Sequence, residues 1–496
     1  MDKKNLDIIN SYQKEIILLN QINSLLNWDQ QTYMPSQGLE SRAEEISVIS
    51  SLIHKKLISD EFFIAINELK NEKLDKKNKR LIEKLYKEIS KAKKIPEKFI
   101  KESSKTTTLS FQAWQNARIK NDFKIFRPWL EKVVELKKKQ ADYLQLYPSA
   151  YDTLIDEFDE GMTVEKLKPF FQDLKKGILE VLKKITNSKL YKTQEISLLK
   201  KEFPKDIQIE FAKDVVKRIG LKEEFSRIDF AEHPFSTRIG FKDVRITTNV
   251  RDTPLFSFFS TIHEAGHALY DLNNSNSKYS FLNEAPSYGL HESQSRFWEL
   301  LIGLNKSFWK FYFPIFNEKF NLQSDIDQWY REINYIKPSL IRIESDEINY
   351  CLHIIIRYEI EAGLLDGSIE VKDLPKIWNQ KMKEYFGLEP MTDKEGVLQD
   401  VHWSQGYFGY FPSYAIGTIY SAQLYNQLKK EIPIIEDIIA KGDFSKITGW
   451  LNDNVHKKGS TMIADDLIKE VTGERLNPKI FLDYLDKKYG EIYGFW

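Results

Sequence analysis

Cysteine is almost absent from this chain, since Cys351 is the only one among 496 residues. A lone cysteine excludes an intramolecular disulfide and a cluster of thiolate metal ligands. An excess of charge of either sign is missing as well, because 73 Lys and Arg residues balance 73 Asp and Glu residues. This balance argues against nucleic acid, or a charged membrane surface, as the dedicated partner.

Long apolar runs are also missing. No window approaches the roughly 18 apolar residues that a membrane-spanning helix needs. The first ten residues, "MDKKNLDIIN", lack the apolar core of a signal peptide. We therefore expect a cytoplasmic protein without a membrane segment. The hydrophobic content of 42% is nevertheless enough for a large buried core.

Helical periodicity dominates what is present. In "RLIEKLYKEISKAKK", Leu81, Ile82, Leu85 and Ile89 recur at the spacing of one helix face. No internal repeat, low-complexity tract or flexible linker interrupts the pattern. The sequence therefore predicts a mostly α fold that forms a single domain over residues 1–496.

Strand-like alternation is strongest in "HPFSTRIGFKDVRITTN", residues 233–249. There, Val244, Ile246 and Thr248 alternate with polar residues, which predicts a strand in a small hairpin that turns near residues 240–243. In the stretch that follows, Thr253 can cap a helix with Pro254 at its first position.

That predicted helix contains "HEAGH", residues 263–267. His263 and His267 are four residues apart, so both imidazoles lie on one helix face and can bind the same metal ion. Glu264 is placed to deprotonate a water molecule that the metal activates. The non-functional alternative is a polar helix that carries two histidines by chance.

A catalytic zinc ion needs a third protein ligand, and no further histidine follows His267 at short spacing. The stretch "FLNEAPSYGLHESQSRFWELLIG" offers Glu284, Glu292 and Glu299. We favour Glu292, which falls in the first turn of a helix predicted to begin near His291, and place Glu284 second. His291 itself is either a support for the site or a surface residue.

Two later stretches also carry polar groups in unusual patterns. In residues 341–363, Arg342, Asp346, Asn349 and His353 are spaced to line one helix face, which is either solvated or the wall of a cleft. In "GVLQDVHWSQGYFGYFPSYAIG", residues 396–417, His402 lies among aromatic residues and glycines. This second stretch is either an aromatic core loop or a source of hydrogen bonds to an oxyanion.

Taken together, these stretches resemble the carboxypeptidase Taq family of metallocarboxypeptidases. The resemblance spans nearly the whole chain and rests on a series of motifs in a fixed order. They are "HPF" (233–235), "DVRIT" (243–247), "HEAGH" (263–267), "HESQ" (291–294), "IRIESD" (341–346) and "GVLQDVHW" (396–403). One departure is Ser345, where the family usually has alanine.

The resemblance implies a large helical fold with a deep central groove and a small antiparallel β-sheet beside the metal, as in angiotensin-converting enzyme and neurolysin. It also implies a homodimer that removes single C-terminal amino acids from peptides with broad preference. The implied cofactor is one zinc ion per chain, with cobalt possible. We expect the helices of about residues 1–110 to form a lid over the groove.

The resemblance, together with the chemistry, also assigns roles to individual residues. Glu264 acts as general base and then general acid, while His402 and Tyr410 stabilise the oxyanion, with Tyr407 and Tyr414 as alternatives to Tyr410. The substrate carboxylate needs an arginine fork. The residues assigned to substrate binding are Arg245, Arg342, His233 and Asp346, with Arg238 as a weaker candidate. The alternatives are a zinc endo-oligopeptidase with the same site and an inactive peptide-binding scaffold.

Overall fold

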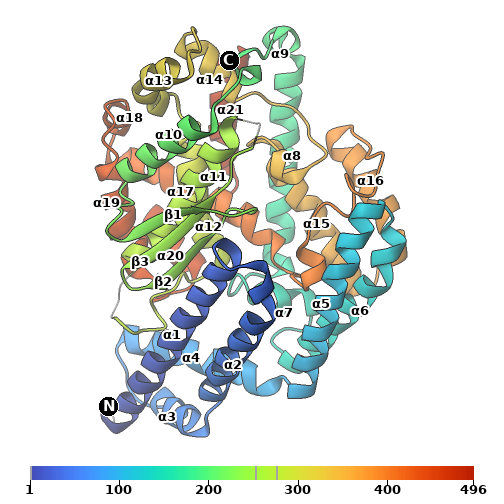
Figure 1. Ribbon diagram of the computed structural model, residues 1–496, viewed down its shortest axis with the longest axis vertical. Helices are drawn as coiled ribbons and strands as arrows, with labels where there is room; N and C mark the ends of the chain where they lie inside the picture. The colour runs from blue at the N-terminus through green and yellow to red at the C-terminus, as the bar shows by residue number, and fades with distance from the viewer. Residues whose placement is uncertain (1–2, 252–253, 275–277, 496) are drawn as a thin grey trace.

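The computed structural model of the chain describes residues 3–251, 254–274 and 278–495. Helices make up most of it, and one small sheet lies at the side of the molecule (Figure 1). The prediction of a mostly helical fold with a small sheet is therefore confirmed. Within the described residues, no helix is both long and apolar enough to cross a membrane.

The N-terminal helices form a layer with a hydrophobic cluster of their own (Figure 1, blue). Ile9 and Ile16 of the first helix pack with Phe62 and Leu85 of later ones, and Phe281 and Leu282 join this cluster from the body of the protein. The elements of this layer are α1 (Lys3–Thr32), η1 (Ser36–Gly38), α2 (Leu39–Leu57), α3 (Asp60–Lys70) and α4 (Lys76–Lys94).

In the sequence, a second group of helices follows this layer and precedes the sheet. Several begin at a side-chain cap, as where the Ser149 hydroxyl accepts a hydrogen bond from the Asp152 N–H. The elements are α5 (Glu97–Lys120), α6 (Phe123–Leu144), α7 (Ala150–Asp156), α8 (Val164–Asn187), α9 (Lys189–Thr193), η2 (Leu198–Lys200) and α10 (Lys205–Arg218).

The sheet contains β1 (Ser226–Phe230), β2 (Ser236–Gly240) and β3 (Asp243–Thr248) in the order β1-β3-β2. The predicted hairpin is present, because β2 and β3 pair antiparallel and Gly240 lies opposite Asp243. The prediction of a fully antiparallel sheet was wrong for β1, because this strand pairs with β3 in parallel. Residues 226–230 are too few and too mixed in polarity for their pattern to predict a strand or its partner.

Three elements follow the sheet and carry the predicted metal ligands and Glu299. They are α11 (Pro254–Asn273), α12 (Tyr288–Arg296) and a π-helical turn, η3 (Phe297–Ile302). The helix predicted around His263 is confirmed as α11, although its proposed cap, Thr253, lies outside the described residues. The helix predicted near His291 begins three residues earlier, because the Ser287 hydroxyl caps it by accepting from the Leu290 N–H.

The C-terminal half builds most of the large hydrophobic core. Helix α17 runs through this core, and its residues Ile416, Ile419 and Tyr420 are fully buried. The remaining elements are α13 (Lys306–Phe320), α14 (Ile326–Ile333), η4 (Arg342–Glu344), α15 (Asn349–Asp366), η5 (Val371–Asp373), α16 (Leu374–Phe386), η6 (His402–Gln405), α17 (Phe411–Glu431), α18 (Ile435–Ile439), α19 (Ser445–Asn454), η7 (His456–Lys458), α20 (Ala464–Thr472) and α21 (Lys479–Tyr493).

The polar stripe predicted from Arg342 to His353 does not lie on one helix. Arg342 lies in the 3₁₀ turn η4, and α15 begins only at Asn349. The Asp346 carboxylate accepts hydrogen bonds from the backbone N–H groups of Ile348 and Asn349, and so caps the start of α15. An aspartate that bonds to nearby backbone N–H groups favours a helix start over a helix interior, and this breaks the expected face.

Candidate metal centre and surrounding groups

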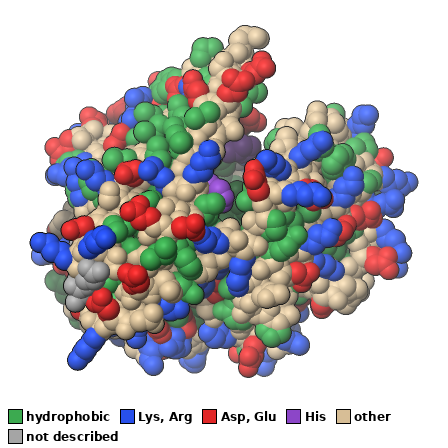
Figure 2. Space-filling model, turned by 90° about the horizontal axis from the view of Figure 1, so that it is seen from below, with side chains coloured by type: hydrophobic (Ala, Val, Ile, Leu, Met, Phe, Trp, Pro, Cys, Tyr) green, Lys and Arg blue, Asp and Glu red, His purple; other side chains and the backbone are tan. Residues whose placement is uncertain are grey.

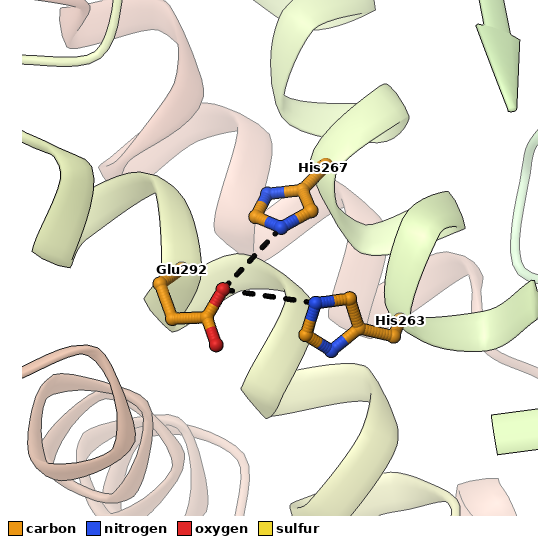
Figure 3. A group of neighbouring side chains, drawn as sticks. All are labelled: His263, His267 and Glu292. Atoms are coloured by element: carbon orange, nitrogen blue, oxygen red, sulfur yellow. Dashed lines mark ion pairs between the residues drawn. The ribbon is translucent and has the colours of Figure 1, made fainter. Parts of the chain in front are cut away.

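Two helices bring the predicted ligands together. His263 and His267 extend from α11, and Glu292 extends from α12 toward both rings (Figure 3). The Glu292 Oε2 atom lies 3.4 Å from His267 Nε2 and 3.7 Å from His263 Nε2. One ligand atom from each residue lies within 4.8 Å of the others. Two imidazole nitrogens and one carboxylate oxygen form a donor set that fits a zinc ion.

A carboxylate on the far side of the His263 ring fixes its orientation. Glu299 Oε2 lies 2.7 Å from His263 Nδ1, so Nε2 is left facing Glu292. Glu299 belongs to the π-helical turn that follows α12, and turns of this kind occur often at functional sites. Arg296 connects the two carboxylates, donating to Glu292 at 2.8 Å and to Glu299 at 3.1 Å. Such supporting contacts raise the affinity of a ligand histidine for metal.

His267 is supported by stacking instead of by a carboxylate. Its ring lies 4.3 Å from that of His291 with an interplanar angle of 15°. The Nε2 atom of His291 lies 3.2 Å from Asp271 Oδ1. Within the described residues, His267 Nδ1 has no hydrogen-bond partner. The structure therefore packs His291 against His267, which favours a supporting residue over a surface residue.

Burial and neighbouring charges shift the pKa values of the ionisable groups in this cluster in different directions. Burial raises the pKa of Glu264 to about 7. Burial disfavours a charged imidazole at His263, but the nearby Glu292 and Glu299 carboxylates outweigh it and raise its pKa to about 9. Burial lowers the pKa of His267 to about 4. Thus in the metal-free protein at neutral pH, His263 carries a proton and His267 does not.

This difference predicts that metal binding releases a proton. A metal ion displaces the proton from His263, so metal affinity should rise with pH by about tenfold per unit between pH 6 and 8. Calorimetric titration with Zn²⁺ at pH 7, in two buffers of different ionisation enthalpy, should show release of about one proton per ion. Affinity that is independent of pH over this range, with no proton released, would contradict the assignment.

Glycines allow the ligand-bearing helices to approach closely. A Cβ atom on Gly266 of α11 would lie 2.5 Å from the Gln294 carbonyl oxygen of α12. A Cβ atom on Gly417 of α17 would lie 2.7 Å from the Glu292 side chain. Larger residues at either position would push α12 away and change the spacing between His267 and Glu292.

Gly266→Ala should therefore damage the metal centre as well as the packing. Overpacking of this kind costs about 1–3 kcal/mol in the free energy of unfolding. Zinc affinity should fall too, because α12 must shift relative to α11. Gly449→Ala on α19 is a matched control, since a Cβ atom there meets nothing within 4 Å. Unfolding by denaturant and zinc titration of both variants test this, and an unchanged zinc affinity in Gly266→Ala would contradict it.

His402 lies beside Tyr414 at the entrance to α17. Its Nε2 atom is 3.2 Å from the Tyr414 hydroxyl, and its ring lies 5.7 Å from that of Tyr410. Burial lowers the pKa of His402 to about 3, which keeps the imidazole neutral. Glu292 raises the pKa of both Tyr410 and Tyr414, in addition to the larger effect of burial. The structure therefore brings these groups within electrostatic reach of the Glu292 carboxylate.

Arg342 is buried in the same region and held by Asp400. Its Nε and one terminal nitrogen donate to Asp400 at 3.1 and 2.8 Å, and its other terminal nitrogen donates to the Tyr350 hydroxyl at 3.0 Å. Its guanidinium lies 5.1 Å from the Tyr414 ring. Arg357 forms a second ion pair with Asp400, and the two arginines hold the pKa of that carboxyl well below its usual range.

The other predicted substrate-binding residues have different partners, and Arg238 lines a pocket together with Asp271 and His291. Arg245 pairs with Asp243 at 2.8 Å and lies over the Trp28 ring of α1, while His233 is exposed between β1 and β2. Asp346 caps α15, as described above. Arg238 donates to the Asn283 carbonyl at 2.8 Å. Glu284, the second choice for the third ligand, pairs instead with Lys84 of α4 at 3.2 Å.

A pocket of about 500 Å³ adjoins the His267 side of the cluster. Asp271, Tyr288 and His291 form one wall, and the opposite wall comes from α1 and α4. Figure 2 shows a hollow on this face of the molecule, with histidine side chains visible inside it. The N-terminal layer therefore borders the space beside the metal centre.

Several supporting residues were missed by the sequence analysis. Arg296 follows Glu292 by four residues, and Asp400 precedes His402 by two within a motif already singled out. Their spacing was thus a signal that could have been used. Tyr350 carries no such signal, because its contact with Arg342 depends on the turn at η4.

Comparisons with known proteins identify the family of this chain. Residues 8–489 match the family model described as carboxypeptidase Taq (M32) metallopeptidase. Carboxypeptidase 1 of Bacillus subtilis (strain 168) is 39% identical over 499 residues, covering 98% of this chain and 99% of that protein. Thermostable carboxypeptidase 1 of Pyrococcus furiosus is 35% identical over 483 residues and covers 96% of each chain.

A solved structure shows the same fold. The crystal structure of the M32 carboxypeptidase from Deinococcus radiodurans R1 superposes with a TM-score of 0.96 at 34% identity, covering 99% of this chain and 100% of that one. With the sequence match spanning almost every residue, the chain belongs to the carboxypeptidase Taq (M32) family of metallopeptidases.

Proposed function

We propose that this metal-dependent carboxypeptidase removes single C-terminal amino acids from peptides, with broad preference, at one zinc ion per chain. The observation that carries the proposal is the convergence of His263, His267 and Glu292 beside the buried Glu264. Nitrogen and carboxylate ligands suit zinc, and the same set accepts cobalt. When bound, the metal ion lowers the pKa of a water molecule and polarises the scissile carbonyl.

Glu264 is the proposed general base. Its side chain is only 8% exposed, and a pKa raised to about 7 by burial suits a group that must gain and lose a proton near neutral pH. Glu264 takes a proton from the attacking water and delivers it to the leaving amine. The charges of His263, Glu292 and His291 all act on the Glu264 carboxyl, which supports this role beside the proposed ligands.

His402 and Tyr410 are the proposed donors to the oxyanion. A neutral imidazole still carries one N–H group, and the raised pKa of Tyr410 keeps its hydroxyl protonated. Both groups can therefore donate a hydrogen bond at neutral pH. Tyr414, which contacts His402, and Tyr407, whose side chain is 45% exposed, are the alternatives to Tyr410.

The free carboxylate of the substrate is assigned to Arg342. This side chain lies close to Tyr414 and His402, whereas Arg245 is paired with Asp243 and packs over the Trp28 ring of α1. Asp400 holds the guanidinium in place, so little conformational freedom is lost when a carboxylate binds. Arg245, His233 and Asp346 remain predictions for contacts farther along the substrate.

Arg342→Lys tests this assignment, because lysine keeps the charge but loses the planar fork. We expect kcat/KM for an N-acylated tetrapeptide with a free carboxylate to fall by about 10- to 100-fold. Activity on the amidated copy, already low, should hardly change. Arg227→Lys, at a half-exposed ion pair with Asp229, serves as control. Equal losses on both peptides would exclude Arg342 as the carboxylate ligand and favour an endo-oligopeptidase.

The N-terminal helices are proposed to act as a lid within one domain that spans residues 1–496. Their separate hydrophobic cluster and their place along one wall of the pocket support this role. Homodimer formation and a cytoplasmic location complete the proposal. Gel filtration with light scattering tests the first, and fractionation of cells tests the second.

A further inference from the structure

The segment between His402 and Tyr410 has an irregular backbone. It begins with the 3₁₀ turn η6, and Gly406 and Gly409 both adopt positive φ angles, of 78° and 86°. Helix α17 starts only at Phe411. His402 lies within η6, but residues 406–410, which lead to Tyr410, belong to no helix or strand. Something else must fix their positions relative to the metal ligands.

One buried carboxylate holds this segment near both ends. Glu361 of α15 is 0% exposed and accepts from the Trp403 indole N–H at 2.8 Å and from the Gly409 N–H at 2.9 Å. Trp403 follows His402 directly, and Gly409 precedes Tyr410. Each anchored residue is therefore adjacent in sequence to a proposed oxyanion donor.

A third donor connects the same carboxylate to α7. The Tyr151 hydroxyl donates to Glu361 Oε2 at 2.9 Å. Gly409 is also pressed against α7, because a Cβ atom there would lie 2.6 Å from the Leu154 backbone. Helices α7 and α15 therefore both contact the segment, and the Glu361 carboxylate bonds to residues of α7 and of the segment.

The surroundings indicate that this anchor has a purpose beyond packing. A buried carboxylate is costly unless it is paired or fully hydrogen-bonded. The nearby cation, Arg357, is already engaged by Asp400. Burial accordingly raises the pKa of Glu361 to about 7. An uncharged acceptor would fill this space at lower cost, but it could not satisfy three donors on two oxygens as a carboxylate does.

We propose that Glu361 is a positioning residue for the reaction, which holds the 402–410 segment so that His402 and Tyr410 meet the oxyanion. The inference rests on the roles given to those two residues above. Glu361 itself does not touch the metal ligands in any contact within the described residues. It acts through the Trp403 and Gly409 N–H groups, one at each end of the segment.

Glu361→Gln tests the proposal with little change in shape. The glutamine oxygen can still accept from Tyr151 and Gly409, but its NH₂ group then faces the Trp403 N–H, so two donors oppose each other. We expect kcat to fall by about 100-fold, because small displacements of catalytic groups have effects of this size. KM and zinc content should not change, and amide hydrogen exchange should become faster in residues 403–409.

Trp403→Phe provides a second variant, since it removes one donor and leaves the carboxylate in place. It should show a smaller change of the same kind. In the double variant no N–H opposes the glutamine NH₂ group, so its kcat loss should be smaller than the product of the two single losses. Glu332→Gln is the matched control, because Glu332 is also buried and accepts the Leu198 N–H at 2.8 Å, with no hydrogen bond to this segment in the described residues.

The outcomes separate this proposal from the function on which it rests. Unchanged hydrogen exchange in residues 403–409 of Glu361→Gln would overturn it. So would faster exchange with normal kcat, if Tyr410→Phe lowers kcat in the same assay. If Tyr410→Phe and His402→Gln also keep normal kcat, the oxyanion roles fail, while faster exchange in residues 403–409 still supports Glu361 as the anchor.

Discussion

Replacing Glu264 by glutamine is expected to reduce kcat by roughly 10²–10⁴-fold while the metal stays bound. Glutamine has nearly the same shape but cannot accept a proton from water. Glu264 is not among the three residues whose ligand atoms converge, so zinc content should equal that of the wild type. The measurement is steady-state hydrolysis of the N-acylated tetrapeptide, with zinc determined by mass spectrometry on the same sample.

The contrast with a ligand variant makes this result specific. His267→Gln removes a ligand atom and should lose zinc and activity together. A Glu264→Gln variant that loses zinc would make Glu264 part of the metal centre. One that keeps both zinc and full kcat would exclude Glu264 as the base.

Tyr410→Phe is expected to lower kcat by about 10²–10³-fold, with a small effect on KM. Loss of a single donor to an oxyanion has this magnitude, because the hydrogen bond strengthens only in the transition state. The Tyr410 ring packs against those of His402, Tyr407 and Tyr414, so removal of its hydroxyl should leave the packing intact. Kinetics at saturating substrate measure the effect.

Two neighbouring tyrosines serve as comparisons. Tyr407→Phe should have little effect, because this residue is the most exposed of the three. Tyr414→Phe should have an intermediate effect, since its hydroxyl contacts His402 Nε2. If Tyr414→Phe costs more than Tyr410→Phe, the oxyanion donor is Tyr414.

The candidate metal centre could be predicted from the sequence because two of its three side chains come from one short segment. His263 and His267 lie on one face of any helix that contains both, whatever surrounds it. Glu292 was chosen because a helix was expected to begin just before it. That helix exists, although Ser287 caps it three residues earlier than expected. The family resemblance, confirmed over residues 8–489, extended the prediction to the fold.

What could not be predicted depends on contacts between distant segments or on rare backbone geometry. Glu299 lies on the same helix face as Glu292, seven residues later, but its contact with His263 depends on how two separate helices pack. The apparent stripe from Arg342 to His353 fitted helical spacing, but Asp346 turned the chain by binding backbone N–H groups. The contacts of Glu361 with Tyr151 and Trp403 link residues 210 and 42 positions away, so no local pattern records them.

The central claim is best tested by a timed digest of an N-acylated tetrapeptide with a free carboxylate. The zinc-loaded protein is run beside a chelated sample and beside an amidated copy of the peptide. The account predicts release of single C-terminal residues, lost on chelation and on amidation. Internal cleavage of both peptides, or no cleavage by the zinc-loaded protein, would contradict it.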